Sequence, residues 1–285
     1  LGKIFKALEK SQHPDSHRQT AEPDELPEPP VAPQAEVRRP EARQPVETHD
    51  TIVTVDPMLV AGFAPQSVEA EQFRLLKNAI LFPEKGTPPR CIMVTSASPG
   101  EGKSFVSANL AISIAQNIDE HVLLIDCDLR SPSLHPLFGI PNPEGLSEYL
   151  NLEKSLPDLL VKTFMNKLTL LPAGRIPPNP SELLSSDLMK NLIQEVRARY
   201  ANRYIIIDTP PPYLTSETNA ISRQVDGIII VIRQGKTHKK DVMDLVETYG
   251  EEKVIGAVYN CAKKPIGYGY SKYGYGKYGY GVKNA

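Results

Sequence analysis

The segment 98–104, which reads Ser-Pro-Gly-Glu-Gly-Lys-Ser, has the residue types of a loop that binds phosphate. It nearly matches G-x-x-x-x-G-K-[ST], with Ala97 where the first glycine would stand. Gly100 and Gly102 allow backbone N–H groups to turn inward around phosphate oxygens, and the following helix adds the positive end of its dipole. Lys103 can reach the β- and γ-phosphates of a nucleotide, and the Ser104 hydroxyl can bind Mg²⁺. The flanking strand and helix patterns favour this interpretation over a simple glycine-rich turn.

Carboxylates follow two apolar runs elsewhere in the chain. Asp126 and Asp128 come directly after the run 122–125, and Asp208 comes directly after the run 204–207. Carboxylates at strand ends beside a phosphate loop can hold Mg²⁺ or accept the proton of an attacking hydroxyl. Arg130 can support these carboxylates or the phosphates. A lone aspartate after an apolar run is usually a turn residue, but two such places behind a phosphate loop favour a functional role.

The elements that must position these groups alternate in type. Continuous apolar strands separated by helices predict a mainly parallel sheet with helices on both faces, an α/β fold of the P-loop NTPase kind. In such sheets, ligands bind beyond the carboxyl ends of the strands. The expected strands are 91–95, 122–125, 168–171, 204–207, 228–232 and 254–259, and the clearest helices are 103–116, 181–199 and 239–249.

Composition limits the class of protein. The chain has 285 residues, of which 40% are hydrophobic and 23% charged, as expected for a soluble core with extensions. Its formal net charge of −2 gives no argument for a nucleic-acid partner. The three cysteines include no C-x-x-C pair, which favours a reducing cytosol over disulfides or zinc. No apolar run reaches the roughly 18 residues of a membrane span and no signal peptide is evident, so we expect a cytoplasmic protein.

Four regions differ in composition. Residues 1–10 could form a short amphipathic helix that docks on a membrane surface or a partner, or they could be a frayed terminus. Residues 11–64 are rich in Pro and Glu and are predicted to be a disordered linker. Residues 65–262 are the expected folded domain, and residues 263–285 a flexible tail.

The tail carries the most distinctive composition. Six of the twelve tyrosines in the chain lie there among glycines and lysines, where they have no core to pack against. A tethered tail can deliver hydroxyls to a neighbour's active site at high effective concentration. Each added phosphate would bring roughly −1.5 to −2 charges and would make this Lys-bearing tail acidic. The predicted phosphate acceptors are Tyr268, Tyr270, Tyr273, Tyr275, Tyr278 and Tyr280.

These features resemble the bacterial tyrosine kinases of capsule and exopolysaccharide synthesis, a branch of the deviant Walker P-loop ATPases. The resemblance covers roughly residues 65–285. It implies an ATP- and Mg²⁺-dependent protein-tyrosine autokinase acting on its own tail. The motifs that carry it are 98–104 (Walker A), 126–130 (Walker A′), 207–211 (Walker B), and the shorter matches 135–139, 145–147, 171–174 and 179–184.

The resemblance also implies roles for single residues. Lys103 and Ser104 would bind the ATP phosphates and Mg²⁺, and Asp208 would hold the metal through water. Asp126 would bind the metal and act as a base towards the tyrosine, with Asp128 assisting, although the sequence leaves open which of the two takes the proton. The nucleotide contacts would come from Pro99, Gly100, Glu101, Gly102, Lys103, Ser104, Phe105, Arg130 and Asn260, the last facing adenine unless it is only a turn residue.

Assembly and partners are likewise implied by the family. Its E-x-x-R-x-x-R helix for ring assembly here has Glu71, Arg74 and Lys77, so the last position loses the bidentate fork of arginine. The alternative is a solvated amphipathic helix. A kinase without a membrane span would be activated by a membrane-spanning polysaccharide co-polymerase, which would place it at the inner face of the plasma membrane. A tyrosine phosphatase would reverse its action.

Two other functions compete with the kinase as explanations of this sequence. One is a nucleotide-dependent switch of the partition or septum-site type, which usually has a second lysine early in the loop, where this chain has residues 97–99 without one. The other is a single-stranded nucleic-acid binder that uses the tail for stacking, which the net charge does not support. The sequence therefore favours the kinase.

Overall fold

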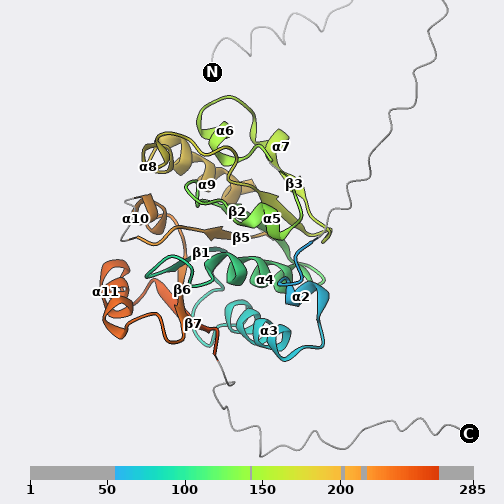
Figure 1. Ribbon diagram of the computed structural model, residues 1–285, viewed down its shortest axis with the longest axis vertical. Helices are drawn as coiled ribbons and strands as arrows, with labels where there is room; N and C mark the ends of the chain where they lie inside the picture. Colours follow the sequence, from blue (N-terminus) through green and yellow to red (C-terminus); the bar gives the residue numbers. More distant parts are fainter. Residues whose placement is uncertain (1–54, 142, 200–202, 213–216, 263–285) are drawn as a thin grey trace, which may run out of the picture. The chain divides into compact units, whose positions relative to one another are not determined.

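The computed structural model describes residues 55–262, apart from 142, 200–202 and 213–216. Its centre is a seven-stranded sheet in the order β3-β4-β2-β5-β1-β6-β7 (Figure 1). All neighbouring strands run parallel except β3 and β4, which are antiparallel. The strands are β1 (Cys91–Ser96), β2 (His121–Asp126), β3 (Val161–Lys162), β4 (Leu168–Leu171), β5 (Arg203–Asp208), β6 (Gly227–Arg233) and β7 (Val254–Asn260).

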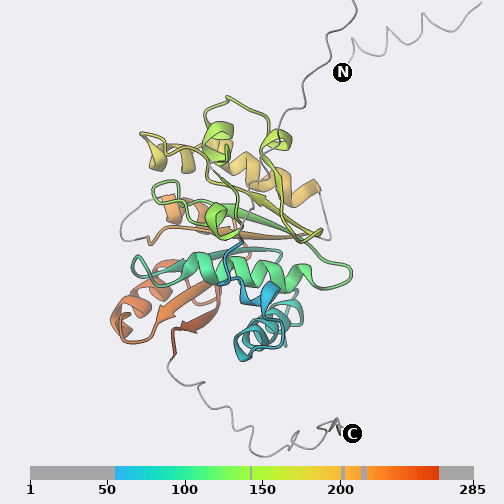
Figure 2. The same ribbon diagram turned by 45° about the vertical axis from the view of Figure 1, so that its right-hand side comes forward.

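Helices cover both faces of this sheet, as the two views in Figures 1 and 2 show. One apolar core contains side chains of α2 to α5 and the other contains side chains of α6 to α11. Alternate residues of β1 enter different cores, Cys91 and Met93 one of them, Ile92 and Val94 the other. The predicted α/β fold is thus confirmed. The helices are α2 (Val60–Phe63), α3 (Val68–Leu81), α4 (Lys103–Ala115), α5 (Leu134–Leu137), α6 (Leu146–Leu150), α7 (Leu156–Leu159), α8 (Pro180–Leu184), α9 (Asp187–Arg199), α10 (Glu217–Ser222) and α11 (Lys239–Tyr249).

The segment 181–199, predicted as one helix, is divided into α8 and α9. The break lies at Ser186, whose hydroxyl donates to the carbonyl of Leu183 at 2.7 Å. The same oxygen accepts the N–H of Met189 at 3.2 Å. Because one serine side chain satisfies the end of α8 and the start of α9, the interruption costs little.

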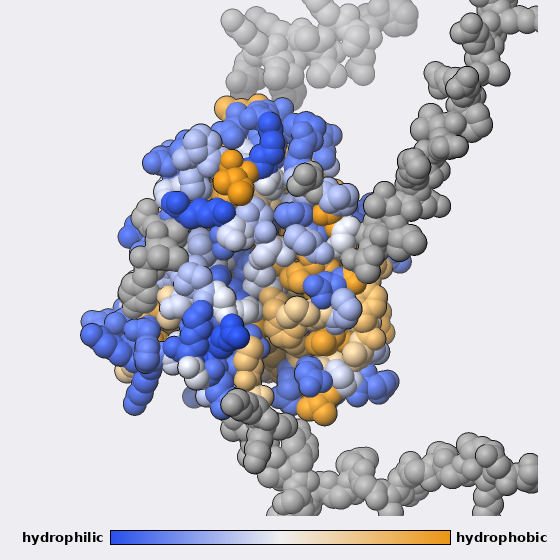
Figure 3. Space-filling view, in the orientation of Figure 1, coloured by the Kyte–Doolittle hydropathy of each residue, from blue (hydrophilic) through white to orange (hydrophobic). Residues whose placement is uncertain are grey.

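The domain begins earlier than the predicted linker boundary at residue 64. Leu59 is fully buried, and the side chain of Asn109 on α4 binds the N–H of Ala61 at 2.9 Å and the carbonyl of Met58 at 3.0 Å. The short apolar stretch 58–63 follows a long Pro-rich segment, and the composition of that segment led to the prediction of a linker up to residue 64. Over α2 the surface is apolar (Figure 3), where the ring of Phe63 lies 5.0 Å from that of Phe164.

The predicted docking helix 1–10, most of the predicted linker and the tyrosine tail lie outside the described residues. Among the helices that the structure does describe, none is long and apolar enough to cross a membrane.

Candidate nucleotide and metal site

The phosphate loop connects the end of β1 to the start of α4, as the sequence predicts. Gly100 and Gly102 have φ values of +72° and +95°, which only glycine adopts easily. A Cβ on Gly102 would also lie 2.1 Å from Nδ2 of Asn260. Both glycines are therefore required by the backbone, and Gly102 is required a second time by the close approach of β7.

Lys103 and Ser104 open α4 at the carboxyl edge of the sheet. Lys103 is only 7% exposed. The hydroxyl of Ser104 donates to Oδ2 of Asp208 at 2.5 Å and accepts the hydroxyl of Ser133 at 2.6 Å. Asp208 also accepts the hydroxyl of Ser107 at 3.1 Å through Oδ1. The loop serine and the carboxylate of the predicted Walker B motif therefore lie in direct contact.

The order of the strands sets Asp126 beside Asp208, because β2 and β5 pair in parallel with these two residues in register. Both are fully buried. Oδ1 of Asp126 accepts the N–H of Asp128 at 3.1 Å, and Oδ2 accepts the N–H groups of Ser133 and Leu134 at 3.2 and 3.1 Å. These three bonds fix the carboxylate in one orientation.

Burial makes the negative charge of this pair costly. Desolvation, followed by the charge of Asp208, raises the pKa of Asp126 from 3.8 to about 8. Desolvation also raises the pKa of Asp208 to about 6, against the opposing effects of its bond from Ser104 and the charge of Lys103. Two carboxylates that resist ionisation together are stabilised by a cation between them. Mg²⁺ takes few protein carboxylates and completes its shell with water and phosphate, so this donor set fits it.

Asp128 and Arg130 lie at the outer side of the site. Asp128 is half-buried, accepts the N–H of Ser131 at 3.0 Å, and has its pKa raised by desolvation. The guanidinium of Arg130 contacts buried Glu217, with Nε 3.4 Å from Oε1, and its Nη2 donates to the hydroxyl of Ser181 at 2.8 Å. The expected support of phosphates by Arg130 therefore stays a prediction.

The side chain of Asn260 contacts the phosphate loop. Its Nδ2 donates to the carbonyl of Glu101 at 2.9 Å, and its Oδ1 accepts the N–H of Cys261 at 2.8 Å. Its predicted contact with adenine is not tested by these bonds. They do show that β7 ends directly against the phosphate loop.

The predicted ring-assembly residues lie on α3, away from this site. Arg74 binds Glu71 at 2.6 Å and the carbonyl of Pro65 at 2.7 Å. Lys77 donates to Asn117 at 2.9 Å, and burial lowers its pKa. All three side chains have partners within the chain, and their role in assembly stays a prediction.

Three residues of the site were missed by the sequence analysis: Ser107, Ser133 and Glu217. Ser107 could have been found, because it follows Lys103 by four residues and so shares its face of α4. Ser133 and Glu217 lie in irregular or short elements, and only the packing of α5 and α10 brings them to the site.

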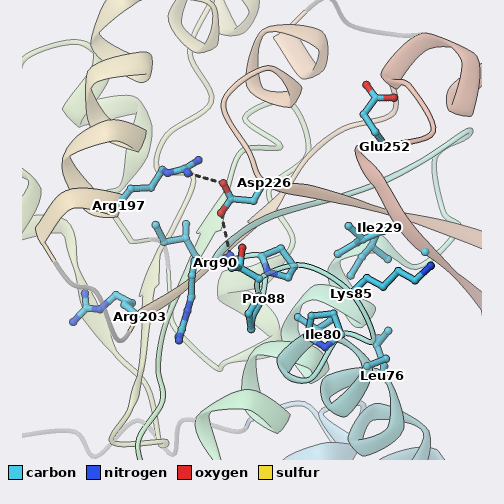
Figure 4. A pocket seen from close by; sticks show the side chains of 17 residues that line it. Leu76, Ile80, Lys85, Pro88, Arg90, Arg197, Arg203, Asp226, Ile229 and Glu252 are labelled. Carbon is cyan, nitrogen blue, oxygen red and sulfur yellow. Dashed lines mark hydrogen bonds and ion pairs between the residues drawn. The ribbon is translucent and has the colours of Figure 1, made fainter.

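A hollow of about 1000 Å³ lies at the amino ends of the strands (Figure 4). Asp226 lines this hollow and accepts hydrogen bonds from Nη2 of Arg197 at 2.5 Å and from the N–H of Arg90 at 3.0 Å. None of the predicted nucleotide contacts lines it. The candidate nucleotide site is therefore at the opposite edge, where the strands end.

Comparisons with known proteins agree with this geometry. The family model described as the CobQ/CobB/MinD/ParA nucleotide binding domain matches residues 92–263. The chain is 38% identical over 216 residues to tyrosine-protein kinase YwqD of Bacillus subtilis, covering 74% of this chain and 90% of that protein. It is 34% identical over 215 residues to the putative tyrosine-protein kinase CapB of Staphylococcus aureus, covering 75% of this chain and 92% of CapB.

Solved structures give the same result. The kinase domain of Escherichia coli tyrosine kinase ETK superposes with a TM-score of 0.65 at 34% identity, covering 80% of this chain and 89% of that one. The chimerical protein CapA2B2 superposes with a TM-score of 0.65 at 32% identity, covering 72% of this chain and 91% of that one.

Proposed function

This chain belongs to the bacterial tyrosine kinases, and we propose that it transfers the γ-phosphate of ATP to the tyrosines of its own C-terminal tail. One observation carries the proposal. Asn260, the last residue of β7, donates to the carbonyl of Glu101, so this strand ends against the phosphate loop. Tyr268, the first of the six tail tyrosines, follows Asn260 by eight residues, a length of chain that spans at most about 28 Å.

The transfer follows from the groups at the carboxyl edge. The phenolic oxygen of a tail tyrosine attacks the γ-phosphorus, and the bond from that phosphorus to the β–γ bridging oxygen breaks, which releases ADP. Lys103 neutralises charge on the β- and γ-phosphates. Ser104, Asp126 and Asp208 would hold Mg²⁺, which supplies positive charge to the transferring phosphoryl group. The phenolic proton passes to a carboxylate.

Either Asp126 or Asp128 serves as that acceptor. Asp126 is fully buried and fixed by three N–H groups, which suits a metal ligand. Asp128 is half-buried and so more accessible to an incoming hydroxyl. If Asp128 takes the proton, Asp128→Asn lowers kcat while Mg²⁺ affinity stays as in the parent. If Asp126 does both, Asp126→Asn loses both and Asp128→Asn changes little.

We further propose that the reaction runs between subunits and acts as a switch. Lys-bearing tails would become acidic on phosphorylation, since each phosphate adds roughly −1.5 to −2 charges, and a ring formed through Glu71, Arg74 and Lys77 would loosen. A membrane-spanning polysaccharide co-polymerase would activate the kinase at the inner face of the plasma membrane, and a tyrosine phosphatase would reset it. The process served would be exopolysaccharide or capsule synthesis.

The first experiment is autophosphorylation with Mg²⁺-ATP, read by intact and tryptic mass spectrometry, with Lys103→Met as the inactive control. We expect phosphate on the tyrosines from Tyr268 to Tyr280 in the parent and none in the control. Cytoplasmic segments of candidate membrane partners are added in parallel, so that a missing activator is excluded. An unmodified tail together with ATP hydrolysis would replace the kinase by the nucleotide-dependent switch.

A mixing experiment separates transfer between subunits from transfer within one. Lys103→Met with an intact tail is incubated with an active chain that ends at residue 262. Phosphate on the inactive subunit supports transfer between subunits. Phosphate that appears only when Lys103 and the tail are on the same chain contradicts it. Oligomer mass before and after the reaction then tests the switch.

A further inference from the structure

Three consecutive carbonyl groups of the phosphate loop are bonded from outside the loop. Lys236 donates to the carbonyl of Pro99, Arg233 donates through Nη1 to that of Gly100 at 2.5 Å, and Asn260 donates to that of Glu101 at 2.9 Å. Two of the three donors come from the turn 233–237, which connects β6 to α11. Neither the motifs nor the reaction steps above assign a task to this turn.

The geometry of an anion-binding loop explains why these bonds matter. A loop whose N–H groups converge on phosphate must direct its carbonyls outward, where each needs a donor. Cationic donors satisfy the carbonyls and also add positive charge near the bound phosphates. Neutral water could bond the carbonyls but would neither fix the loop nor contribute charge.

The turn is itself held in one conformation and reaches the loop at a third point. The Thr237 hydroxyl accepts the N–H of Arg233 at 2.8 Å and donates to a carboxylate oxygen of Glu101. Glu101 is fully buried, and its other carboxylate oxygen accepts the N–H of Ser98 at 3.0 Å. Thr237 therefore connects the turn to both ends of the glycine-rich segment.

We propose that the turn 233–237 is a positioning element for nucleotide phosphates. Arg233, Lys236 and Thr237 keep the loop carbonyls and the Glu101 carboxylate on the side of the loop away from the phosphate, so that the loop N–H groups face the phosphate. The three residues act through the loop and are not catalytic. The proposal rests on the nucleotide binding proposed above. It predicts that losing the turn's contacts weakens phosphate binding more than it slows the transfer step.

The test measures binding of a fluorescent ADP with Mg²⁺, and its displacement by inorganic pyrophosphate, which carries no base or sugar. The variants are Arg233→Gln, Lys236→Met and their combination. Lys240→Met, on an exposed lysine of the adjacent α11, is the matched control. We expect the combined variant to bind fluorescent ADP and pyrophosphate about tenfold or more weakly, with KM for ATP raised by a similar factor and kcat changed less than about threefold.

Substitution of Thr237 distinguishes positioning of the loop from direct contact of Arg233 and Lys236 with the ligand. Thr237→Val carries no change in charge, yet it frees Glu101. We expect it to weaken pyrophosphate binding about threefold or more, while Thr237→Ser retains the parent affinity. Parent-like pyrophosphate affinity in Thr237→Val, or in the combined variant, overturns the proposal. A parent chain that fails to bind fluorescent ADP overturns the proposed function instead, so the two failures are separate.

Discussion

Replacing Asp126 by asparagine removes an ionisable carboxyl group that the fold buries completely. The unfolded chain keeps the ordinary carboxyl pKa of 3.8, whereas burial and the charge of Asp208 raise the folded pKa to about 8. Between these values the folded protein retains a proton that the unfolded chain releases. The stability contributed by the protonated carboxyl is therefore complete below pH 3.8 and is lost as pH rises towards about 8.

The size of this effect follows from the two pKa values. At about 1.36 kcal/mol per pH unit, the stability lost from pH 3.8 upward is about 2 kcal/mol at pH 5 and about 4 kcal/mol at pH 7. Water entry and local relaxation reduce the difference, so we expect about 1–3 kcal/mol between the two pH values. An asparagine can still accept from Ser133 and Leu134 but turns its NH₂ towards the N–H of Asp128. That costs about 1 kcal/mol at both pH values and cancels from the difference.

The assay is urea unfolding of the parent and Asp126→Asn at pH 5 and pH 7, with chelator and without nucleotide. We expect the free energy of unfolding of the variant, relative to that of the parent, to increase by about 1–3 kcal/mol from pH 5 to pH 7. Adding Mg²⁺-ADP at pH 7 should stabilise the parent more than the variant, because only the parent offers that carboxylate to the metal. A stability difference between the two proteins that is the same at both pH values would refute the reasoning. Asp128→Asn, at a half-buried position, is the control and should show a smaller change.

Three further substitutions test other parts of the structure. In Gly102→Ala, the added Cβ would lie 2.1 Å from Nδ2 of Asn260, and the alanine would need a φ near +95°, a strain of about 1–2 kcal/mol or more. Calorimetry should therefore show the affinity for ADP lowered at least about tenfold, and a parent-like affinity would contradict the loop geometry. Leu59→Ala should cost about 2–4 kcal/mol in urea unfolding because the side chain is fully buried, and a cost under about 0.5 kcal/mol would return residues 55–64 to the linker. Glu217→Gln and Arg130→Gln should each raise the KM for ATP, because the two side chains form one ion pair. The KM of the double variant should be no higher than that of the poorer single variant. Additive increases in KM would show that the two residues act independently.

The sequence by itself determined the parts of this protein that depend on local pattern. The apolar runs predicted most of the strands, because a strand that is buried on both faces of a parallel sheet consists of a continuous run of apolar residues. The loop from Ser98 to Ser104 could be located because glycines, lysine and serine at fixed spacing have few other uses. Asp126 and Asp208 could be placed at one edge of the sheet, since parallel strands all end at the same edge.

The tertiary structure decided everything that depends on which strands and helices become neighbours. Insertion of β5 between β1 and β2 sets Asp126 in register with Asp208 and so creates the buried carboxylate pair. Packing of α5 brings Ser133 to Ser104, and the turn after β6 brings Arg233 to Gly100. These contacts join residues roughly 30 to 130 positions apart. Local spacing contains no information on such pairs, because they form only when burial of two apolar cores fixes the order of the strands.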